Sequence, residues 1–177
     1  MGRWRPAAFA LLLFLALGGA IAWWFTPPRP QGPGDQIIVD KSRNRLYYYS
    51  AGRLVRSYPV ATGRHIQWTP EGRFYIASKL VDPLGGPDAG SRLGSRWMGL
   101  ATPQDLLGTR YGIHGTSEPG SMGTHASAGC IRMHNIHVEE LYDLVAVGTP
   151  VEIRRGWPWG WRLHQWLDQR SRGRPPV

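Results

Sequence analysis

Two residues of this 177-residue chain have the types and spacing of a nucleophilic site. Cys130 is the only cysteine, and His114 lies sixteen residues before it. A free thiol titrates near about 8.5, so little thiolate exists at neutral pH unless a base such as an imidazole accepts the proton. A glycine before the thiol, here Gly129, lets the backbone turn sharply and leaves amide N–H groups available to an oxyanion. The pair therefore indicates covalent catalysis by cysteine, with histidine as general base and acid.

The histidine of such a pair needs its second ring nitrogen held by an acceptor, which fixes the tautomer. No carboxylate accompanies His114 in a pattern that forces contact, since the nearest acids are Asp105 and Glu118. A backbone carbonyl could orient the ring, and that of Gly115 is the local candidate.

Two other interpretations of these residues stay open. A lone cysteine is usually a small buried hydrophobe, and a lone histidine is usually structural. Zinc is the second alternative, because His125, His134 and His137 lie near Cys130. Their spacings match no closed zinc pattern, and a single thiolate is a poor start for a structural site. The sequence therefore implies neither a metal nor an organic cofactor.

The segments around the pair resemble the L,D-transpeptidase catalytic domain (the YkuD-like family). The resemblance covers about residues 36 to 154 and rests on His114-Gly115-Thr116 and on the segment SAGCIRMHN that holds Cys130. Upstream segments fall in the family's order: Ile37–Asp40, Arg45–Tyr49, Tyr58–Gly63 and Thr69–Phe74. One departure is Ala128, where many members have a histidine. That histidine is not the base, so the departure puts substrate positioning in doubt rather than the core chemistry.

The resemblance implies a mainly β (α+β) fold of two packed mixed β-sheets with one or two short helices. It implies a peptidoglycan L,D-transpeptidase that joins stem peptides by 3–3 cross-links through a cysteine thioester. In that chemistry Cys130 is the nucleophile, His114 the general base and acid, Gly115 the carbonyl that orients His114, and Gly129 part of the backbone oxyanion site.

Four further residues are candidates for substrate contact: Arg132, Ser127, Tyr111 and Asn135. Arg132 could hold a donor carboxylate through a bidentate contact, or brace the cysteine loop. Ser127 could instead shape the turn, and Asn135 is also a candidate helix N-cap.

Two alternative functions remain open. Hydrolysis of the same thioester would make the protein an L,D-carboxypeptidase, and a chain that keeps the fold without the chemistry would be a wall-binding module. A nucleic-acid binder is disfavoured by the distribution of the net charge of +9. Residues 1–34 carry +3, residues 35–153 only +1, and residues 154–177 +5. A nearly neutral core argues against a basic nucleic-acid groove.

The flanks predict an exported protein. Residues 7–25 carry no charge and follow two arginines, which suits either a membrane anchor or a signal peptide with an A-x-A site at residues 20–22. As a helix they would span roughly 28 Å. We expect residues 1–25 to direct the protein to the outer side of the cytoplasmic membrane, anchored or secreted, and residues 26–35 to be a Pro/Gly spacer that holds the domain off the membrane.

The tail, residues 155–177, is basic and rich in tryptophan, which suits contact with anionic lipid or wall polymers as well as packing on its own domain. We expect peptidoglycan stem peptides as partners and a monomeric chain.

The elements that must position the pair are mostly short strands. Apolar and aromatic runs predict strands at residues 37–40, 45–50, 54–61, 74–78, 111–114 and 149–153. Residues 82–96 are a glycine-rich loop expected to border the cleft. A helix is expected from Asn135 to a stop at Gly148, with Val138, Leu141, Leu144 and Val145 as its buried stripe.

Overall fold

The computed structural model of the chain describes residues 27–156. The expected membrane segment and the tail beyond residue 156 lie outside the described residues. Within residues 27–156, no helix combines the length and the hydropathy needed to cross a bilayer.

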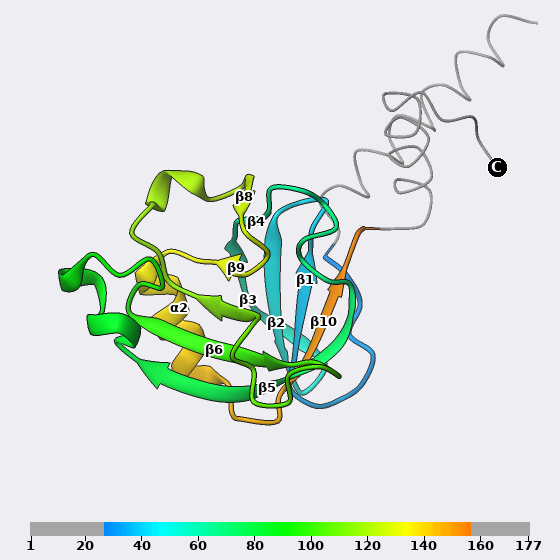
Figure 1. The fold of residues 1–177 in the computed structure, drawn as a ribbon. Coiled ribbons are helices and arrows are strands. Elements are labelled where there is room, and N and C mark those ends of the chain that lie inside the picture. The colour runs from blue at the N-terminus through cyan, green and yellow to red at the C-terminus, as the bar shows by residue number, and fades with distance from the viewer. Residues whose placement is uncertain (1–26, 157–177) are drawn as a thin grey trace, which may run out of the picture.

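Eight strands form one mixed sheet in the order β3-β2-β1-β10-β5-β6-β7-β9 (Figure 1). They are β1 (Gln36–Asp40), β2 (Arg45–Ser50), β3 (Arg53–Pro59), β5 (Gly72–Val81), β6 (Arg96–Ala101), β7 (Gly112–His114), β9 (Ile131–Arg132) and β10 (Pro150–Arg154). The β1–β10 and β7–β9 pairs are parallel, and the others are antiparallel. A separate parallel pair joins β4 (Thr62–Gly63) to β8 (His125–Ser127).

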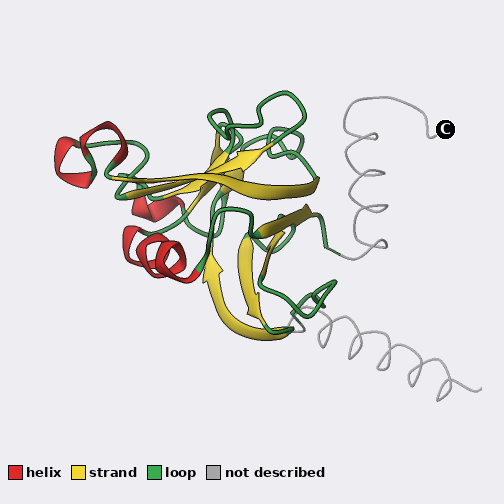
Figure 2. Cartoon of the chain, turned by 90° about the horizontal axis from the view of Figure 1, so that it is seen from below, coloured by secondary structure: helices red, strands yellow, loops and turns green. Residues whose placement is uncertain are grey.

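The long strand β5 divides the sheet into two halves. Gly72–Tyr75 pair with β10, whereas Tyr75–Val81 pair with β6 across a register shift between Ile76 and Ser78. Such irregularities bend a strand and increase its twist. The sheet therefore curls, and Figure 2 shows its strands in two layers that cross. This is the mainly β fold with mixed pairing that the sequence predicts, and its two layers are halves of one continuous sheet.

One apolar core joins the two halves. Its fully buried side chains alternate along the strands, as a period of two requires. It includes Ile37 and Val39 from β1, Met98 from β6, Ile113 from β7 and Ile131 beside Cys130. A smaller cluster of Ile38, Tyr47 and Tyr49 packs on the other face of β1 and β2. The tyrosines of β2 thus serve sheet packing.

The helix α2 (Asn135–Leu144) packs on the core side of β6 and β7 through Val138 and Leu141. Three expectations for this helix are wrong. Its N-cap is His134 rather than Asn135, and it ends at Leu144, four residues before Gly148. Leu144, expected in the buried stripe, is 38% exposed. The chain turns extended at Val145, whose side chain is buried in the core, because the segment must return to β10.

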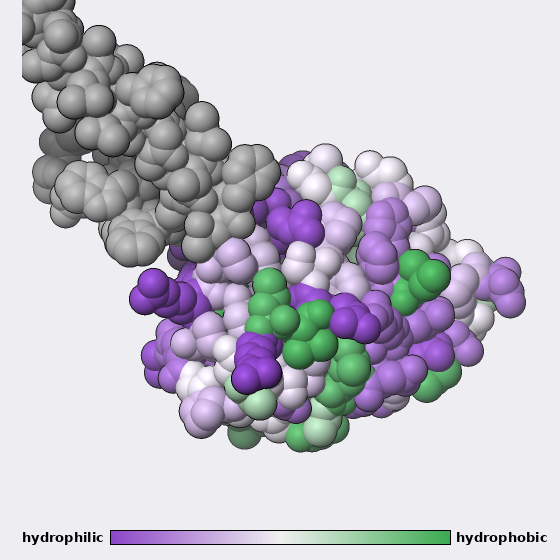
Figure 3. Space-filling view, turned by 180° about the vertical axis from the view of Figure 1, so that it is seen from behind, coloured by the Kyte–Doolittle hydropathy of each residue, from purple (hydrophilic) through white to green (hydrophobic). Residues whose placement is uncertain are grey.

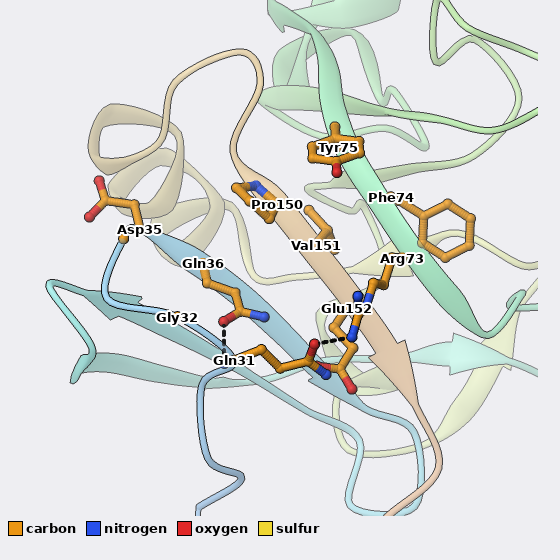
Figure 4. Close-up of a pocket in the computed structure, with 11 residues that line it drawn as sticks. Gln31, Gly32, Asp35, Gln36, Arg73, Phe74, Tyr75, Pro150, Val151 and Glu152 are labelled. Carbon is orange, nitrogen blue, oxygen red and sulfur yellow. Dashed lines mark hydrogen bonds between the residues drawn. The ribbon is translucent and has the colours of Figure 1, made fainter.

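The segment before β1 lies along the domain instead of extending from it. The Tyr49 hydroxyl donates to the carbonyl of Pro28, and Gln31 Nε2 donates to Glu152 Oε2 at 2.9 Å. Gln31 also bonds to Arg73 on β5, and with its neighbours it lines a cavity of about 290 Å³ (Figure 4). The polar groups of Pro28 and Gln31 are thus bonded to the sheet, and the role of residues 26–35 as a spacer stays a prediction.

The three 3₁₀ turns lie in the loops around the site. They are η1 (Pro83–Gly85), η2 (Pro87–Ala89) and η3 (Pro119–Ser121).

Some exposed side chains are apolar, such as Leu80 and Val81 on β5 and Leu144 on α2. Figure 3 shows apolar residues gathered on the face seen from behind.

Candidate active site

The pairing of β7 with β9 brings the candidate catalytic residues to one face of the sheet. Ile113 lies opposite Ile131 and His114 opposite Arg132. Successive side chains of a strand point to opposite faces. Because Ile113 and Ile131 point into the core, the side chains of His114, Arg132 and the preceding Cys130 belong to the other face. The sheet edge at β7 and β9 in Figure 1 therefore carries a thiol, an imidazole and a guanidinium.

The ring of His114 is fixed from two sides. Its Nδ1 lies 2.6 Å from the carbonyl oxygen of Gly115, the acceptor that the sequence suggested. The bond requires a proton on Nδ1 and leaves Nε2 as the free base. On β6, Trp97 lies opposite His114 and stacks on it with ring centroids 5.6 Å apart. Gly112 makes room for this ring, since a Cβ there would lie 2.7 Å from the Trp97 indole.

The sulfur of Cys130 lies near backbone groups of Arg110 and Gly112, at the start of the strand that carries His114. The thiol donates to the carbonyl of Arg110 at 3.9 Å. Burial raises the pKa of the Cys130 thiol, and the Gly112 N–H and the charge of Arg132 act in the opposite direction. The resting group is therefore a thiol.

The imidazole is also uncharged at rest. Burial lowers the pKa of His114 from its ordinary 6.5 to about 4; the carbonyls of Gly115 and Leu93 raise it, and the charge of Arg132 lowers it. His114 is only 4% exposed, which accounts for the dominance of burial. A thiol with a raised pKa beside an imidazole with a lowered one favours a neutral pair.

The loop before Cys130 is held by Ser127. The Ser127 hydroxyl donates to the Cys130 carbonyl at 2.6 Å and accepts the Gly129 N–H at 3.0 Å. Ser127 is 2% exposed, and its bonds shape the turn, whereas the substrate contact also considered for it stays a prediction. The Gly129 N–H is therefore already bonded in the free protein, and the oxyanion site formed by the amides around Gly129 and Cys130 stays a prediction.

Gly129 is required by the backbone. Its φ is +133°, and a Cβ would lie 2.7 Å from the Trp68 carbonyl oxygen and 3.1 Å from Tyr111. The side chain of Tyr111, a candidate for substrate contact, therefore packs beside the cysteine loop and against the core. Ala128 is exposed, so the family departure changes the outer surface of this loop.

A buried threonine connects the cysteine loop to the loop between β4 and β5. The hydroxyl of Thr69 donates to the Gly129 carbonyl at 2.8 Å and accepts the Gly63 N–H at 2.8 Å. Thr69 is fully buried. Its hydroxyl therefore sets the distance between two glycine backbones, one of which adjoins the nucleophile.

Lys41, at the end of β1, supports the same loop from the far half of the sheet. Its Nζ donates to the carbonyls of Ile66 and Thr69 and to Glu71 Oε1 at 3.0 Å. The side chain is 1% exposed, and burial lowers the pKa of Lys41 while Glu71 raises it. A cation buried this fully needs such partners. Lys41 thus fixes residues 66–71 against the cysteine loop.

Arg132 is paired in the site. Its Nη1 lies 2.7 Å from Glu118 Oε2, and the two side chains are 16% and 60% exposed. Its backbone exchanges hydrogen bonds of 2.9 Å with Ala61. The guanidinium is therefore mostly buried, with Nη1 on Glu118, and both roles considered for Arg132, the carboxylate contact and the brace, stay predictions.

The side chain of Asn135 connects two loops instead of capping the helix. Its Oδ1 accepts the N–H of Thr116 at 2.9 Å and of Ser95 at 3.4 Å. A Cβ at Gly94 would lie 2.2 Å from this oxygen. The loop 82–95 is therefore packed on the segment after His114, and the substrate contact expected of Asn135 stays a prediction.

The three histidines of the zinc alternative, His125, His134 and His137, do not come together in one site. His125 contacts Thr62 on β4, whereas His134 and His137 contact each other at the start of α2. No three His, Cys, Asp or Glu side chains are close enough to hold a metal ion in the part of the chain that is described.

Four features of the site were missed from the sequence: Lys41, Thr69, Trp97 and the pairing of Glu118 with Arg132. Trp97 could have been found, because it begins the apolar run before the strand of His114. Lys41 and Thr69 carry no local signal, since Lys41 bonds to a segment 25 residues away and Thr69 to Gly129, 60 residues away.

Residues 34–153 match the YkuD family, described as the L,D-transpeptidase catalytic domain. The chain belongs to the L,D-transpeptidase family. A relative from Bacillus licheniformis named L,D-transpeptidase YkuD is 41% identical over 118 residues, which cover 67% of this chain and 64% of the relative. The YkuD of Bacillus subtilis is 43% identical over 128 residues, covering 72% and 71%. The chain thus spans less than two thirds of the first relative's length.

Solved structures agree with this placement. The NMR structure of the catalytic domain of an Enterococcus faecium L,D-transpeptidase is 28% identical, with a TM-score of 0.55, and the match covers 71% of this chain and all of that one. An L,D-transpeptidase from Mycobacterium smegmatis shares the fold, with a TM-score of 0.55 at 23% identity and coverage of 70% and 59%.

Proposed function

We propose that this chain is a peptidoglycan L,D-transpeptidase that forms 3–3 cross-links through a thioester on Cys130. The donor is a stem tetrapeptide, and the bond cleaved joins its third residue to the terminal D-alanine. The observation that carries the proposal is the bond between His114 Nδ1 and the Gly115 carbonyl, because it leaves Nε2 free as a base on the face that holds the thiol.

Acylation begins from the neutral pair. As the sulfur of Cys130 attacks the donor carbonyl, His114 Nε2 takes the thiol proton. The carbonyl oxygen becomes an oxyanion near the Cys130 N–H, an interaction typically worth about 3 kcal/mol. The C–N bond then breaks, His114 returns the proton to the departing amine, and D-alanine leaves.

Deacylation reverses these roles. A side-chain amine of a neighbouring stem attacks the thioester while His114 accepts one of its protons. The C–S bond breaks, the proton returns to sulfur, and the cross-linked peptide leaves. Water in place of the amine would give a tripeptide, which is the carboxypeptidase outcome.

We assign Arg132 to binding the terminal carboxylate of the donor peptide. Its guanidinium shares the face of Cys130, is partly exposed and presents a planar fork that matches a carboxylate. Its charge also lies close enough to act on both reacting groups.

The location follows from the flanks and the reaction. We assign residues 1–25 to export or anchoring, residues 36–154 to catalysis and residues 155–177 to contact with anionic lipid or wall polymer, with the monomer acting outside the cytoplasmic membrane. No role in nucleic-acid binding is assigned, because the catalytic residues lie in a segment of net charge +1.

The test is to incubate the full chain with disaccharide-tetrapeptide and to follow the products by mass spectrometry, beside a Cys130→Ala control. Loss of D-alanine with a cross-linked dimer, absent in the control, is expected. Loss of D-alanine with tripeptide alone would assign a carboxypeptidase. No Cys130-dependent change in a folded protein would contradict the enzyme and favour a binding module.

A further inference from the structure

The loop between β7 and β8 places one carboxylate on the guanidinium of the site. Glu118 Oε2 accepts from Arg132 Nη1 at 2.7 Å, the one side-chain hydrogen bond that Arg132 makes within residues 27–156. The contact is a single point, so the rest of the guanidinium fork is unused. Arg132 is 16% exposed, whereas Glu118 is 60% exposed.

The backbone of Glu118 is fixed although its side chain reaches into solvent. Its N–H donates to Thr116 Oγ1 at 3.0 Å, and its carbonyl accepts from the N–H and the hydroxyl of Ser121. These bonds hold the start of η3. The carboxylate can therefore leave Arg132 by side-chain rotation, without a change of the loop.

We propose that Glu118 is an exchangeable counter-ion, which occupies Arg132 in the free enzyme and is displaced by the terminal carboxylate of the donor peptide. This inference rests on the proposed function, because it names the ligand that the same site selects: a peptide whose residue after the scissile bond carries a free carboxylate.

The exchange is favourable because the contact of Arg132 with Glu118 is weaker than its contact with a donor carboxylate would be. A single-point pair with an exposed partner is worth little, since water screens it and the side chain loses rotamer freedom. A donor carboxylate could use both arms of the fork in a bidentate contact from which water is excluded. An uncharged end, such as an amide, could not displace Glu118, and it would gain nothing from its removal.

Glu118 also serves the free enzyme. The charge of Arg132 lowers the pKa of both His114 and Cys130. A neighbouring carboxylate offsets that charge until a substrate carboxylate takes its place. The site thus keeps nearly the same net charge before and after donor binding.

The experiment compares Glu118→Gln with the wild type on two donors, a tetrapeptide with a free C-terminal carboxylate and the same peptide with a C-terminal amide. We expect the KM for the acid donor to fall about threefold to fivefold, with kcat unchanged and the KM for the amide donor unchanged. Arg132→Lys, which keeps the charge but loses the fork, should raise the KM of the acid donor selectively.

Glu140→Gln is the matched control, because Glu140 forms an exposed ion pair with Arg56 on β3, at the other edge of the sheet. It should leave both KM values unchanged. An equal fall for both donors in Glu118→Gln, or a rise for the acid donor, would overturn the proposal.

A binding measurement separates this proposal from the proposed function. Both peptides are titrated by calorimetry into two inactive proteins, the Cys130→Ala variant and the double variant that carries Cys130→Ala and Glu118→Gln. Tighter binding of the acid peptide alone to the double variant supports the exchange even if the wild type releases no D-alanine. Equal affinities in the two proteins would overturn the exchange even if the wild type is an active transpeptidase.

Discussion

The two halves of the curled sheet differ in what they place on the face turned away from the core. In the half built from β1, β2 and β10, that face holds the apolar cluster of Ile38, Tyr47 and Tyr49. In the half built from β6, β7 and β9, it holds the polar groups of His114 and Arg132. The first half uses both faces for packing, whereas the second buries reactive groups that packing alone would not favour.

The contrast explains the state of the reacting groups. Burial beside Trp97 and the loop 82–95 removes water from His114 and keeps it neutral, while the same burial keeps Cys130 a thiol. Backbone partners such as the Gly115 carbonyl offset the loss of water. Substitutions in the second half should therefore change chemistry, and substitutions of apolar core residues in the first half should change stability alone.

The largest effect on activity is expected from His114→Gln. The variant lacks the base at Nε2, so the rate of D-alanine release should fall at least about 100-fold, as for the loss of a general base. The rate is measured by mass spectrometry, and circular dichroism checks the fold. A loss below about threefold would show that the histidine is structural.

The same substitution should change the pH dependence of stability. The folded pKa of His114 is about 4 and its ordinary value is 6.5, so the unfolded chain binds more protons between these values. Stability is then lost as pH falls from about 6.5 to 4, by about 3 kcal/mol. Urea unfolding across this range should show the loss in the wild type and a smaller one in His114→Gln. An equal loss in both would assign it to other groups.

Gly129→Ala is the next test, with Gly148→Ala as its control. Both glycines have positive φ, but a Cβ at Gly129 would meet the Trp68 carbonyl, whereas at Gly148 it would meet nothing within 4 Å. Backbone strain of about 1–3 kcal/mol applies to both. We expect D-alanine release to fall about tenfold to 100-fold only in Gly129→Ala, because the nucleophile must shift. Equal activities in the two variants would contradict this.

Thr69→Val should lower kcat about tenfold, because it removes the hydroxyl between Gly63 and the Gly129 carbonyl. Thr69→Ser keeps the hydroxyl and should retain most of the activity. Thr149→Val, which removes a buried hydroxyl bonded to the Ala146 N–H away from the site, is the control for lost stability. If Thr69→Val and Thr149→Val change kcat alike, the hydrogen bonds of Thr69 to Gly63 and Gly129 have no role in catalysis.

The smallest effect on activity is expected in the first half. Ile37→Ala removes a fully buried side chain of β1 and should cost about 2–5 kcal/mol in the free energy of unfolding. Its kcat, measured well below the melting temperature, should stay within about twofold of the wild type. A large loss of kcat would remove the distinction between the halves.

The sequence predicts the first half better than the second, for a physical reason. The strands at residues 36–40, 45–50 and 150–154 follow from local runs of apolar and aromatic residues, and they are found close to the predicted bounds. The two-residue strands β4 and β9 have no such pattern, because pairing partners far along the chain define them. The same reason hides Lys41 and Thr69, whose acceptors come from other segments.

The reacting residues could be predicted from the sequence, whereas the hydrogen bonds of their neighbours could not. Cys130 and His114 are indicated by type, spacing and resemblance. The bonds of Ser127 and Asn135 depend on how two loops fold against each other, which spacing does not encode. Asn135 has the type of an N-cap, but its oxygen is taken by Thr116 and Ser95 and His134 occupies the cap position.

The most direct test of the neutral pair is the pH dependence of alkylation of Cys130 by iodoacetamide, followed by mass spectrometry on the full chain. Cys130 is the only cysteine, so the signal is unambiguous. Because burial raises the pKa of the thiol, the account predicts slow modification at pH 6 and a rate that still rises above pH 9. A fast plateau already reached at pH 6, and lost in His114→Gln, would contradict it and establish a preformed thiolate–imidazolium pair.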